Sequence, residues 1–288
     1  MHYTKGSDTS IVMGLLILML ALLLFTQLSI KPRLWLYPVV RQLTMIKLDY
    51  DTRDMGEYRT EHFLIKYTAV DSDQVAMVAK AAEAAYYPVT DILGYTIGKR
   101  AIIYIYPDHQ EMKRTFGWAG DESTMGAYYS GVIQVLSPQK WLKNGERADA
   151  FVHSGPITHE FTHLVLDYQT SGNYSRWFTE GLAQYVEYKV NHYEWITSTN
   201  RLTGNLYTLA ELDEHFADLP NQALAYRESF AAVRFIADQF GEIKLRQIDD
   251  LLAQGKPLKE IIPIVLGLTY ADYEENWKTW ARDYLEDH

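Results

Sequence analysis

The pattern of hydrophobic and polar positions divides the chain into an apolar N-terminal run, a strand-rich segment and a helical segment. The run covers residues 11–30 and carries no charged side chain. Short apolar stretches over residues 61–150 predict β-strands, whereas long helical patterns dominate residues 151–288. The pattern therefore predicts an α+β fold, with a strand-rich first half and a helical second half.

The strand-rich part contains two single strands, a helix and a hairpin. Residues 62–67 and 101–106 are predicted strands, and an Ala-rich helix that opens on a capping residue is predicted between them. Residues 126–136 contain two β-prone runs around a Ser-Gly pair, which predicts a hairpin. In the second half, helical patterns cover residues 156–168, 177–190, 229–240 and 270–285.

The first 60 residues are expected to lie outside the folded domain. Residues 11–30 are long and apolar enough to cross the hydrocarbon core, so we predict one transmembrane helix after a short tail of residues 1–10. A cleaved signal peptide is the alternative, but no small-x-small cleavage pattern follows the run. Residues 31–60 are predicted to be a juxtamembrane connector, because residues 47–60 are polar and charged.

The residues just after the apolar run bear on its orientation. Trp35 and Tyr37 lie beside Lys31 and Arg33, a combination typical of the headgroup boundary, although a short connecting strand explains the two aromatic residues equally well. Because Lys31 and Arg33 follow the run and only Lys5 precedes it, these charges favour a cytoplasmic position for the rest of the chain.

Composition limits the possible chemistry. The formal net charge of −10 argues against a broad phosphate-binding face, so we expect no nucleic-acid partner. The chain has no cysteine, which excludes disulfides, thiolate metal sites and a cysteine nucleophile. A metal ion would therefore have to be held by His, Asp or Glu.

The most informative motif is THEFTH at residues 158–163. On a helix, positions i and i+4 lie one above the other, so His159 and His163 can direct two imidazoles at one zinc ion. Glu160 is offset around the helix, close enough to take a proton from a metal-bound water. An ordinary core helix with two hydrogen-bonded histidines is the alternative interpretation.

A catalytic zinc requires a third protein ligand and an open position for water. The next candidate is Glu180, on a second predicted helix. Gly181 and Ala183 beside it are small and would let this helix approach the first one closely. Glu187 is the alternative third ligand, although a carboxylate on a solvated helix face explains it as well.

These residues carry a family resemblance. HEFTH, followed after sixteen residues by the glutamate of WFTEGLA, resembles the gluzincin superfamily of zinc metallopeptidases, which includes thermolysin and aminopeptidase N, and is most similar to bacterial peptidase MA-like proteins. The resemblance implies one zinc ion on His159, His163 and Glu180, with Glu160 as general base. It also implies a peptide or protein substrate and a catalytic domain outside the cytoplasm, at the surface of the membrane that residues 11–30 would enter.

The resemblance suggests further site residues. Aminopeptidase-type gluzincins use a tyrosine after the third ligand to stabilise the oxyanion, and we assign this role to Tyr226, with Tyr193 and Tyr207 as alternatives. Asp167 and Gln184 each lie one turn beyond a predicted ligand, where they could orient a metal-bound imidazole or simply face solvent.

Gluzincins also bind extended substrate along an edge strand ahead of the metal-binding helix. The candidate is residues 132–136, with residues 126–129 as hairpin partner; an interior strand is the alternative. Aminopeptidases place a Gly-Ala-Met-Glu-Asn motif there, whereas this chain reads MGAYYSG. The departure favours an endopeptidase.

Two other functions remain as alternatives. A catalytically silent, membrane-anchored binding or assembly module could use the same fold, but the joint presence of His159, His163, Glu160 and Glu180 argues against decay. A structural zinc site normally has four protein ligands, often cysteine, which this chain lacks. The remaining histidines for which a surface or packing role is expected are His153, His192 and His215.

Overall fold

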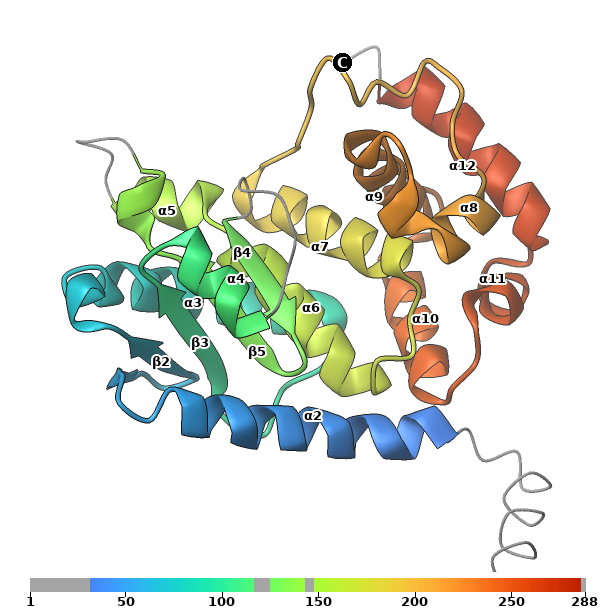
Figure 1. Cartoon of the computed structure of the whole chain (residues 1–288). Helices are drawn as coiled ribbons and strands as arrows, with labels where there is room; N and C mark the ends of the chain where they lie inside the picture. Colours follow the sequence, from blue (N-terminus) through green and yellow to red (C-terminus); the bar gives the residue numbers. More distant parts are fainter. Residues whose placement is uncertain (1–31, 117–124, 143–147, 286–288) are drawn as a thin grey trace, which may run out of the picture.

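The computed structural model describes residues 32–116, 125–142 and 148–285 (Figure 1). The predicted tail and anchor, residues 1–30, lie outside the described residues. Among the residues that are described, no helix combines the length and the apolar character needed to cross a membrane. The described chain folds as a mixed α and β structure in which a sheet is followed by a largely helical second half.

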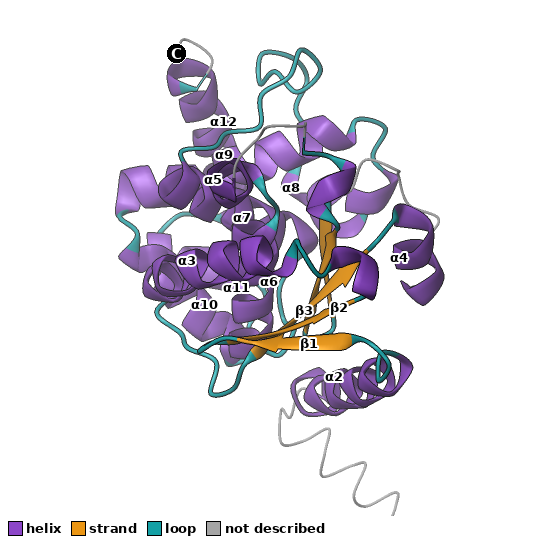
Figure 2. Cartoon of the chain, turned by 90° about the vertical axis from the view of Figure 1, so that its left-hand side faces the viewer, coloured by secondary structure: helices purple, strands orange, loops and turns teal. Residues whose placement is uncertain are grey.

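A five-stranded mixed sheet organises the first half of the described chain (Figures 1 and 2). Its order is β1-β2-β3-β5-β4, in which β2, β3 and β5 run parallel and the two outer strands run antiparallel to their neighbours. The strands are β1 (Gly56–Arg59), β2 (Phe63–Tyr67), β3 (Ala101–Tyr106), β4 (Gly126–Tyr129) and β5 (Val132–Leu136).

Helices cover both faces of this sheet because its central strands are apolar on both sides. One face carries Phe63, Ile103 and Val135 and packs against α3 (Val75–Leu93) and α6 (Ile157–Thr170). The other carries Tyr104 and Val132 and packs against α2 (Pro32–Asp51) and α4 (His109–Phe116). The predicted zinc-binding motif, residues 158–163, therefore lies on a helix that packs directly on the sheet.

Helices build the second half around a shared apolar core. Helix α9 packs along α7, and α10 packs against both α6 and α9. The bounds are α5 (Ala148–Ser154), α7 (Arg176–Asn191), α8 (Leu209–Glu214), α9 (Gln222–Phe240), α10 (Ile243–Ala253), α11 (Leu258–Leu266) and α12 (Tyr270–Tyr284). A short 3-10 helix lies at Phe216–Asp218, and two others lie in the first half, at Ala69–Asp71 and Pro138–Lys140.

The predicted hairpin is confirmed, but its edge is the other strand. Ser130 and Gly131 turn the chain with φ of 47° and 96°, the left-handed region that tight hairpin turns use. Strand β5 pairs with β3 on one side and β4 on the other, so it is an interior strand. The expectation that residues 132–136 form the edge is therefore wrong, and β4 is the edge strand.

The predicted connector at residues 31–60 also needs correction, because α2 and β1 occupy most of it. The outward side of α2 is apolar and its inward side includes the buried Arg41, which is the reverse of an ordinary surface helix. All four residues of β1 are exposed, so this strand has no hydrophobic alternation. Since β1 pairs with β2, the sheet begins before residue 61, where the domain was expected to start.

Several predicted elements are confirmed with small shifts at their ends. Strands β2 and β3 and helices α6, α7 and α12 lie where the pattern places them. Helix α3 follows Gln74, whose side chain makes no capping hydrogen bond, so the predicted capping residue is not observed. Helix α9 begins at Gln222, seven residues before the predicted start at Ser229, and Tyr226 therefore lies inside its first turns.

Candidate metal centre

Two helices bring three potential metal ligands together. His159 and His163 lie one turn apart on α6, and Glu180 lies in the second turn of α7. The Nε2 atoms of the two imidazoles are each 3.3 Å from the same oxygen, Oε2 of Glu180. Within the described residues, this is the cluster whose ligand atoms all fall within 4.8 Å of one another. The three residues predicted to bind zinc therefore converge on one point.

This donor set fits zinc. A tetrahedral zinc ion with ligands at about 2.0 to 2.1 Å separates neighbouring ligand atoms by about 3.3 to 3.4 Å. The two distances from the imidazoles to Glu180 match that separation. Two imidazoles and one carboxylate are also a set typical of catalytic zinc, in which a fourth position stays open.

Burial makes the electrostatics of the cluster strong. Burial alone would raise the pKa of Glu180, but the imidazoles of His163 and His159 lower it well below its usual range. Burial likewise opposes charge on His159, yet Glu187 and Glu180 raise its pKa well above the ordinary value. The negative charge held here is thus compensated by positive charge, whether from imidazolium or from a metal ion.

Each imidazole is held from behind through its other nitrogen. Nδ1 of His159 lies 2.8 Å from Oε2 of Glu187, and Nδ1 of His163 lies 2.7 Å from Oγ1 of Thr179. Such contacts select the tautomer that leaves Nε2 free to bind a metal. Glu187 is therefore neither a third ligand nor a solvated surface carboxylate in this structure. It faces the far side of His159.

Asp167 and Gln184 do not contact the imidazoles. The carboxylate of Asp167 is fully buried and accepts hydrogen bonds from Tyr37 and Arg41 of α2, each at 2.6 Å. The amide of Gln184 donates to the backbone oxygen of Tyr226 at 2.8 Å. Instead of orienting the imidazoles, Asp167 attaches α2 to α6, and Gln184 attaches α9 to α7.

Glu160 lies beside the edge strand. Its side chain is buried, and burial raises its pKa although the neighbouring imidazoles oppose that shift. A Cβ placed on Gly126, the first residue of β4, would come within 3.1 Å of Cγ of Glu160 and 2.5 Å of Pro156. The close approach that glycine permits here puts the start of the edge strand next to the predicted base.

Tyr226 reaches the cluster from α9. Its hydroxyl lies 3.4 Å from Oε1 of Glu180, the oxygen that does not face the imidazoles. A Cβ on Gly181 would lie 2.2 Å from the backbone oxygen of Ser229. Gly181 therefore allows α7 to approach α9, and not α6 as expected, and this approach brings Tyr226 to the cluster.

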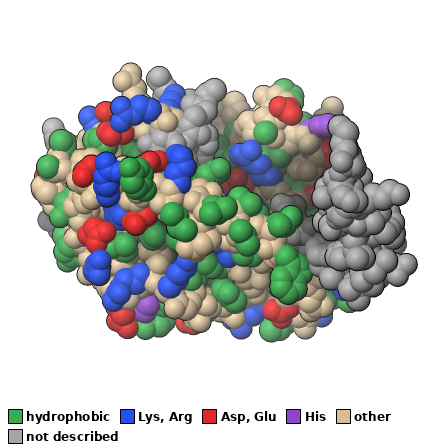
Figure 3. Space-filling view, turned by 60° about the horizontal axis from the view of Figure 1, so that its bottom comes forward, with side chains coloured by type: hydrophobic (Ala, Val, Ile, Leu, Met, Phe, Trp, Pro, Cys, Tyr) green, Lys and Arg blue, Asp and Glu red, His purple; other side chains and the backbone are tan. Residues whose placement is uncertain are grey.

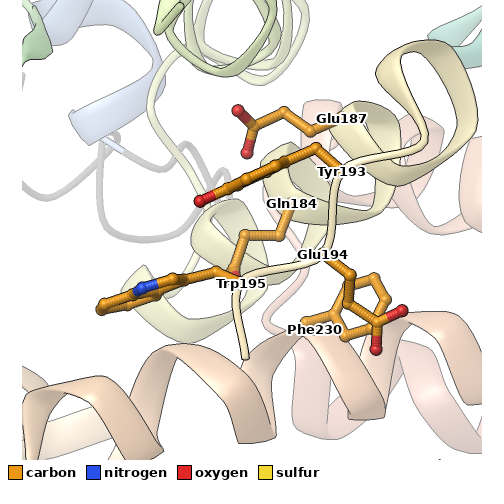
Figure 4. Close-up of a pocket in the computed structure, with 6 residues that line it drawn as sticks. All are labelled: Gln184, Glu187, Tyr193, Glu194, Trp195 and Phe230. Carbon is orange, nitrogen blue, oxygen red and sulfur yellow. The ribbon is translucent and has the colours of Figure 1, made fainter. Parts of the chain in front are cut away.

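The two alternative tyrosines have other surroundings. The hydroxyl of Tyr207 accepts a hydrogen bond from the backbone of Asn221, at the start of α9. Tyr193 is half exposed and lines a pocket next to His159, because the pocket also includes Glu187 (Figure 4). In addition to these two residues the pocket is lined by Gln184, Glu194, Trp195 and Phe230.

Two contacts at the site were missed by sequence reasoning. Thr179, the partner of His163, is adjacent to Glu180, and its hydroxyl carries no recognisable motif. Arg176 lies one turn before Glu180, with Nε 3.5 Å from Oε1 of that residue. The i, i+4 spacing of Arg176 and Glu180 is a signal that could have identified this pair. His153, His192 and His215 are exposed and lie outside the cluster, as expected.

Comparisons with known proteins place the chain in a family. The family model for the peptidase MA superfamily matches residues 81–283. Among solved structures, the fold is similar to a mutant of a two-domain M1 zinc metallopeptidase bound to L-arginine (13% identity, TM-score 0.41) and to an M1 zinc metallopeptidase from Deinococcus radiodurans (13% identity, TM-score 0.38). Each match covers 78% of this chain and 50% of the other, so the chain spans half the length of these structures. A search of curated proteins found no match. Because the family model covers most of its residues, including the whole metal cluster, the chain belongs to the peptidase MA superfamily.

Proposed function

We propose that this protein is a zinc-dependent endopeptidase whose metal is held by His159, His163 and Glu180. The observation that carries the proposal is the convergence of both Nε2 atoms on one oxygen of Glu180, at the spacing of a tetrahedral zinc site. Three protein ligands leave room for a water molecule, which is the arrangement of a catalytic site. Zinc bound there would supply Lewis acidity to that water and to the scissile carbonyl.

The protein side chains divide the remaining work. Glu160 takes a proton from the attacking water and delivers it to the leaving amine. Tyr226 donates its hydroxyl proton in a hydrogen bond to the oxyanion, because the hydroxyl lies at the edge of the cluster beside Glu180. The contacts of Glu187 and Thr179 keep the imidazoles aligned while charge develops.

Strand β4 is the proposed binding site for the substrate backbone. Among the residues that the structure describes it pairs with β5 alone, and a Cβ on its first residue, Gly126, would lie 3.1 Å from Cγ of Glu160. An extended peptide added to this edge would bring its main chain past the general base and the ligand cluster. Main-chain pairing does not require a free terminus, which agrees with the departure of MGAYYSG from the aminopeptidase motif and supports cleavage of internal bonds.

The test uses the purified full-length chain and a mixture of unmodified peptides. Metal content is measured by plasma mass spectrometry, and products are mapped by mass spectrometry before chelation, after chelation and after zinc is returned. We expect about one zinc per chain and chelator-sensitive cleavage at internal bonds. Stepwise release of N-terminal residues would indicate an aminopeptidase instead. A zinc-loaded chain that cleaves no peptide would favour the silent binding module.

We further propose that residues 11–30 anchor the chain in a membrane, with the catalytic domain outside the cytoplasm. The uncharged run supports the anchor, and the family resemblance supports the orientation, against the positive charges of Lys31 and Arg33. Protease treatment of intact cells tests the orientation. The domain should be degraded without lysis, and full protection until lysis would reverse the orientation.

A further inference from the structure

Helix α2 presents an apolar stripe to the outside of the molecule. Among the described residues, seven of the eighteen exposed large hydrophobic side chains lie on this one helix. Leu36, Val39, Val40, Leu43 and Ile46 are each 55% to 61% exposed and follow a spacing of three and four, so they share one face. Trp35 and Tyr50, at 70% and 66% exposed, lie at its two ends. A stripe this continuous is not an ordinary solvated surface.

The inward side of α2 is what joins it to the domain. Tyr37 and Arg41 bond to the buried Asp167 of α6, and Met45 and Leu48 pack in the apolar cluster on that face of the sheet. The orientation of the helix about its own axis is therefore set by buried contacts. Rotation that would bury the outer stripe would break the ion pair of Arg41 and Asp167, so the stripe remains facing outward.

Charge is nearly absent from the stripe. Between residues 34 and 46 the only charged side chain is Arg41, and it faces inward. Lys47, which follows Ile46, is exposed and pairs with Asp51 at 2.9 Å. In Figure 3, hydrophobic side chains gather on the face that α2 presents, and Lys, Arg, Asp and Glu lie mainly toward its left side. Between residues 34 and 46 the stripe carries no acidic side chain, and the acidic residues of α2, Asp49 and Asp51, lie at its C-terminal end. The stripe is thus suited to an apolar partner.

The position of the helix in the chain identifies this partner. The uncharged run ends at residue 30, and α2 begins at Pro32. If the run spans a bilayer as proposed, α2 starts at the bilayer surface, and its 20 residues are about 30 Å long. Figure 1 shows the folded domain on one side of α2, so the exposed stripe lies on the side of the helix that is turned away from the domain. Aromatic residues at the two ends are common in helices that lie in the interface.

We propose that the outer stripe of α2 lies in the surface of a lipid bilayer as an interfacial helix. The domain would thus be held at the membrane by a broad, oriented contact in addition to the anchor. The inference uses the proposed anchor for its location and does not depend on peptidase activity. The ion pair with Asp167 links this membrane contact directly to the helix that carries the predicted zinc ligands.

The test uses the absence of cysteine in the full-length chain. Single variants Leu36→Cys and Leu43→Cys place a nitroxide spin label on the stripe, and Ile264→Cys on α11, 60% exposed, is the matched control. Each variant is reconstituted in vesicles of phosphatidylcholine and phosphatidylglycerol. Power-saturation measurements then compare collisions of the label with oxygen, which concentrates in lipid, and with a water-soluble nickel chelate. Zinc content and hydrolysis are recorded for each labelled variant.

We expect labels at positions 36 and 43 to favour oxygen and the label at position 264 to favour the chelate. Stripe labels that are as accessible to the chelate as the control would overturn the proposal. Spin–spin broadening between copies without a gain in oxygen collisions would assign the stripe to a second copy and also overturn it. If stripe labels favour oxygen but alkaline carbonate releases the chain from the vesicles, the stripe contacts lipid and residues 11–30 do not span the bilayer. That result would support the interfacial helix and reject the anchor.

Discussion

The two halves of helix α6 carry two buried polar clusters. They differ in whether other side chains of the protein neutralise the buried carboxylate. In the first half, His159 and His163 face the carboxylate of Glu180 with spacing left for a fourth participant. In the second half, Asp167 is closed by its ion pair with Arg41 and by the hydroxyl of Tyr37. The three α6 residues are four positions apart, so the same helical spacing supports both clusters.

Buried charge can therefore contribute to stability in one cluster and to chemistry in the other. A buried charge whose partners are all supplied by the protein contributes to holding elements together, and removing one partner is costly. A cluster of three ligands can instead bind a metal ion, and the fourth coordination position of that ion is left for water or substrate. We therefore expect changes in the first half of α6 to act on metal binding and changes in the second half to act on stability.

The largest effect is expected from His163→Ala, which removes a ligand from the open cluster. Zinc affinity should fall by more than 100-fold, because loss of even an outer partner of a ligand costs about 10- to 100-fold. Hydrolysis should disappear while the circular dichroism spectrum is retained. Zinc content and peptide cleavage are measured together, with the exposed His153→Ala as control. Zinc retained at the wild-type level would remove His163 from the ligand set.

A change in the cluster around Asp167 should lower stability and leave zinc binding unchanged. Arg41→Met leaves the carboxylate of Asp167 buried without its cation, which should lower the free energy of unfolding by about 3 to 5 kcal/mol. Zinc per folded chain should stay unchanged. Urea denaturation measures the loss. Lys47→Met on the exposed side of the same helix is the matched control, with an expected loss of about 0 to 1 kcal/mol. Equal stability of the two variants would contradict the distinction between the clusters.

Tyr226→Phe tests a residue that borders the open cluster without binding the metal. Turnover should fall roughly tenfold to a thousandfold, the scale for removal of one donor to an oxyanion, with zinc content unchanged. Steady-state kinetics with Tyr207→Phe as control measures the effect, since the Tyr207 hydroxyl contacts the backbone of Asn221 instead. A normal turnover number for the Tyr226 variant would exclude the role.

The smallest effect is expected from Glu187→Gln, which weakens the support behind His159. An amide keeps the size of the side chain but removes the charge that holds the imidazole, so zinc affinity should fall about 10- to 100-fold. Competition with a chelator of known affinity measures it. Activity at saturating zinc should remain close to wild type. Complete loss of zinc at saturation would mean that Glu187 is itself a ligand.

The sequence predicted the open cluster well because its signals are local. The spacing of His159 and His163 depends only on the helical repeat, and Glu180 follows on the next predicted helix. Whether Glu187 faces His159 or solvent depends on how α7 is rotated against α6, which spacing along one helix does not determine. Its role could therefore be recognised only from the structure.

Regions around the sheet were harder to predict for two physical reasons. Strand order depends on pairing between distant segments, so the internal position of β5 and the edge position of β4 could not be derived from local patterns. Helix α2 has apolar residues on its outer side as well as Met45 and Leu48 inside, and Arg41 is also buried, so the usual rule that the apolar face points to the core does not give its orientation. Strand β4 is the proposed binding site for the substrate, and α2 is the proposed contact with the membrane. Both predictions therefore failed at surfaces for which a partner is proposed.

The most direct test of the central claim is a paired measurement of zinc content and peptide hydrolysis in the wild type and Glu160→Gln. Glu160 lies next to the start of the edge strand and is not one of the three clustered residues His159, His163 and Glu180. We expect about one zinc per chain in both proteins and a loss of hydrolysis of at least about 100-fold in the variant, as when a general base is removed. Equal zinc with equal rates of cleavage in the two proteins would contradict this expectation.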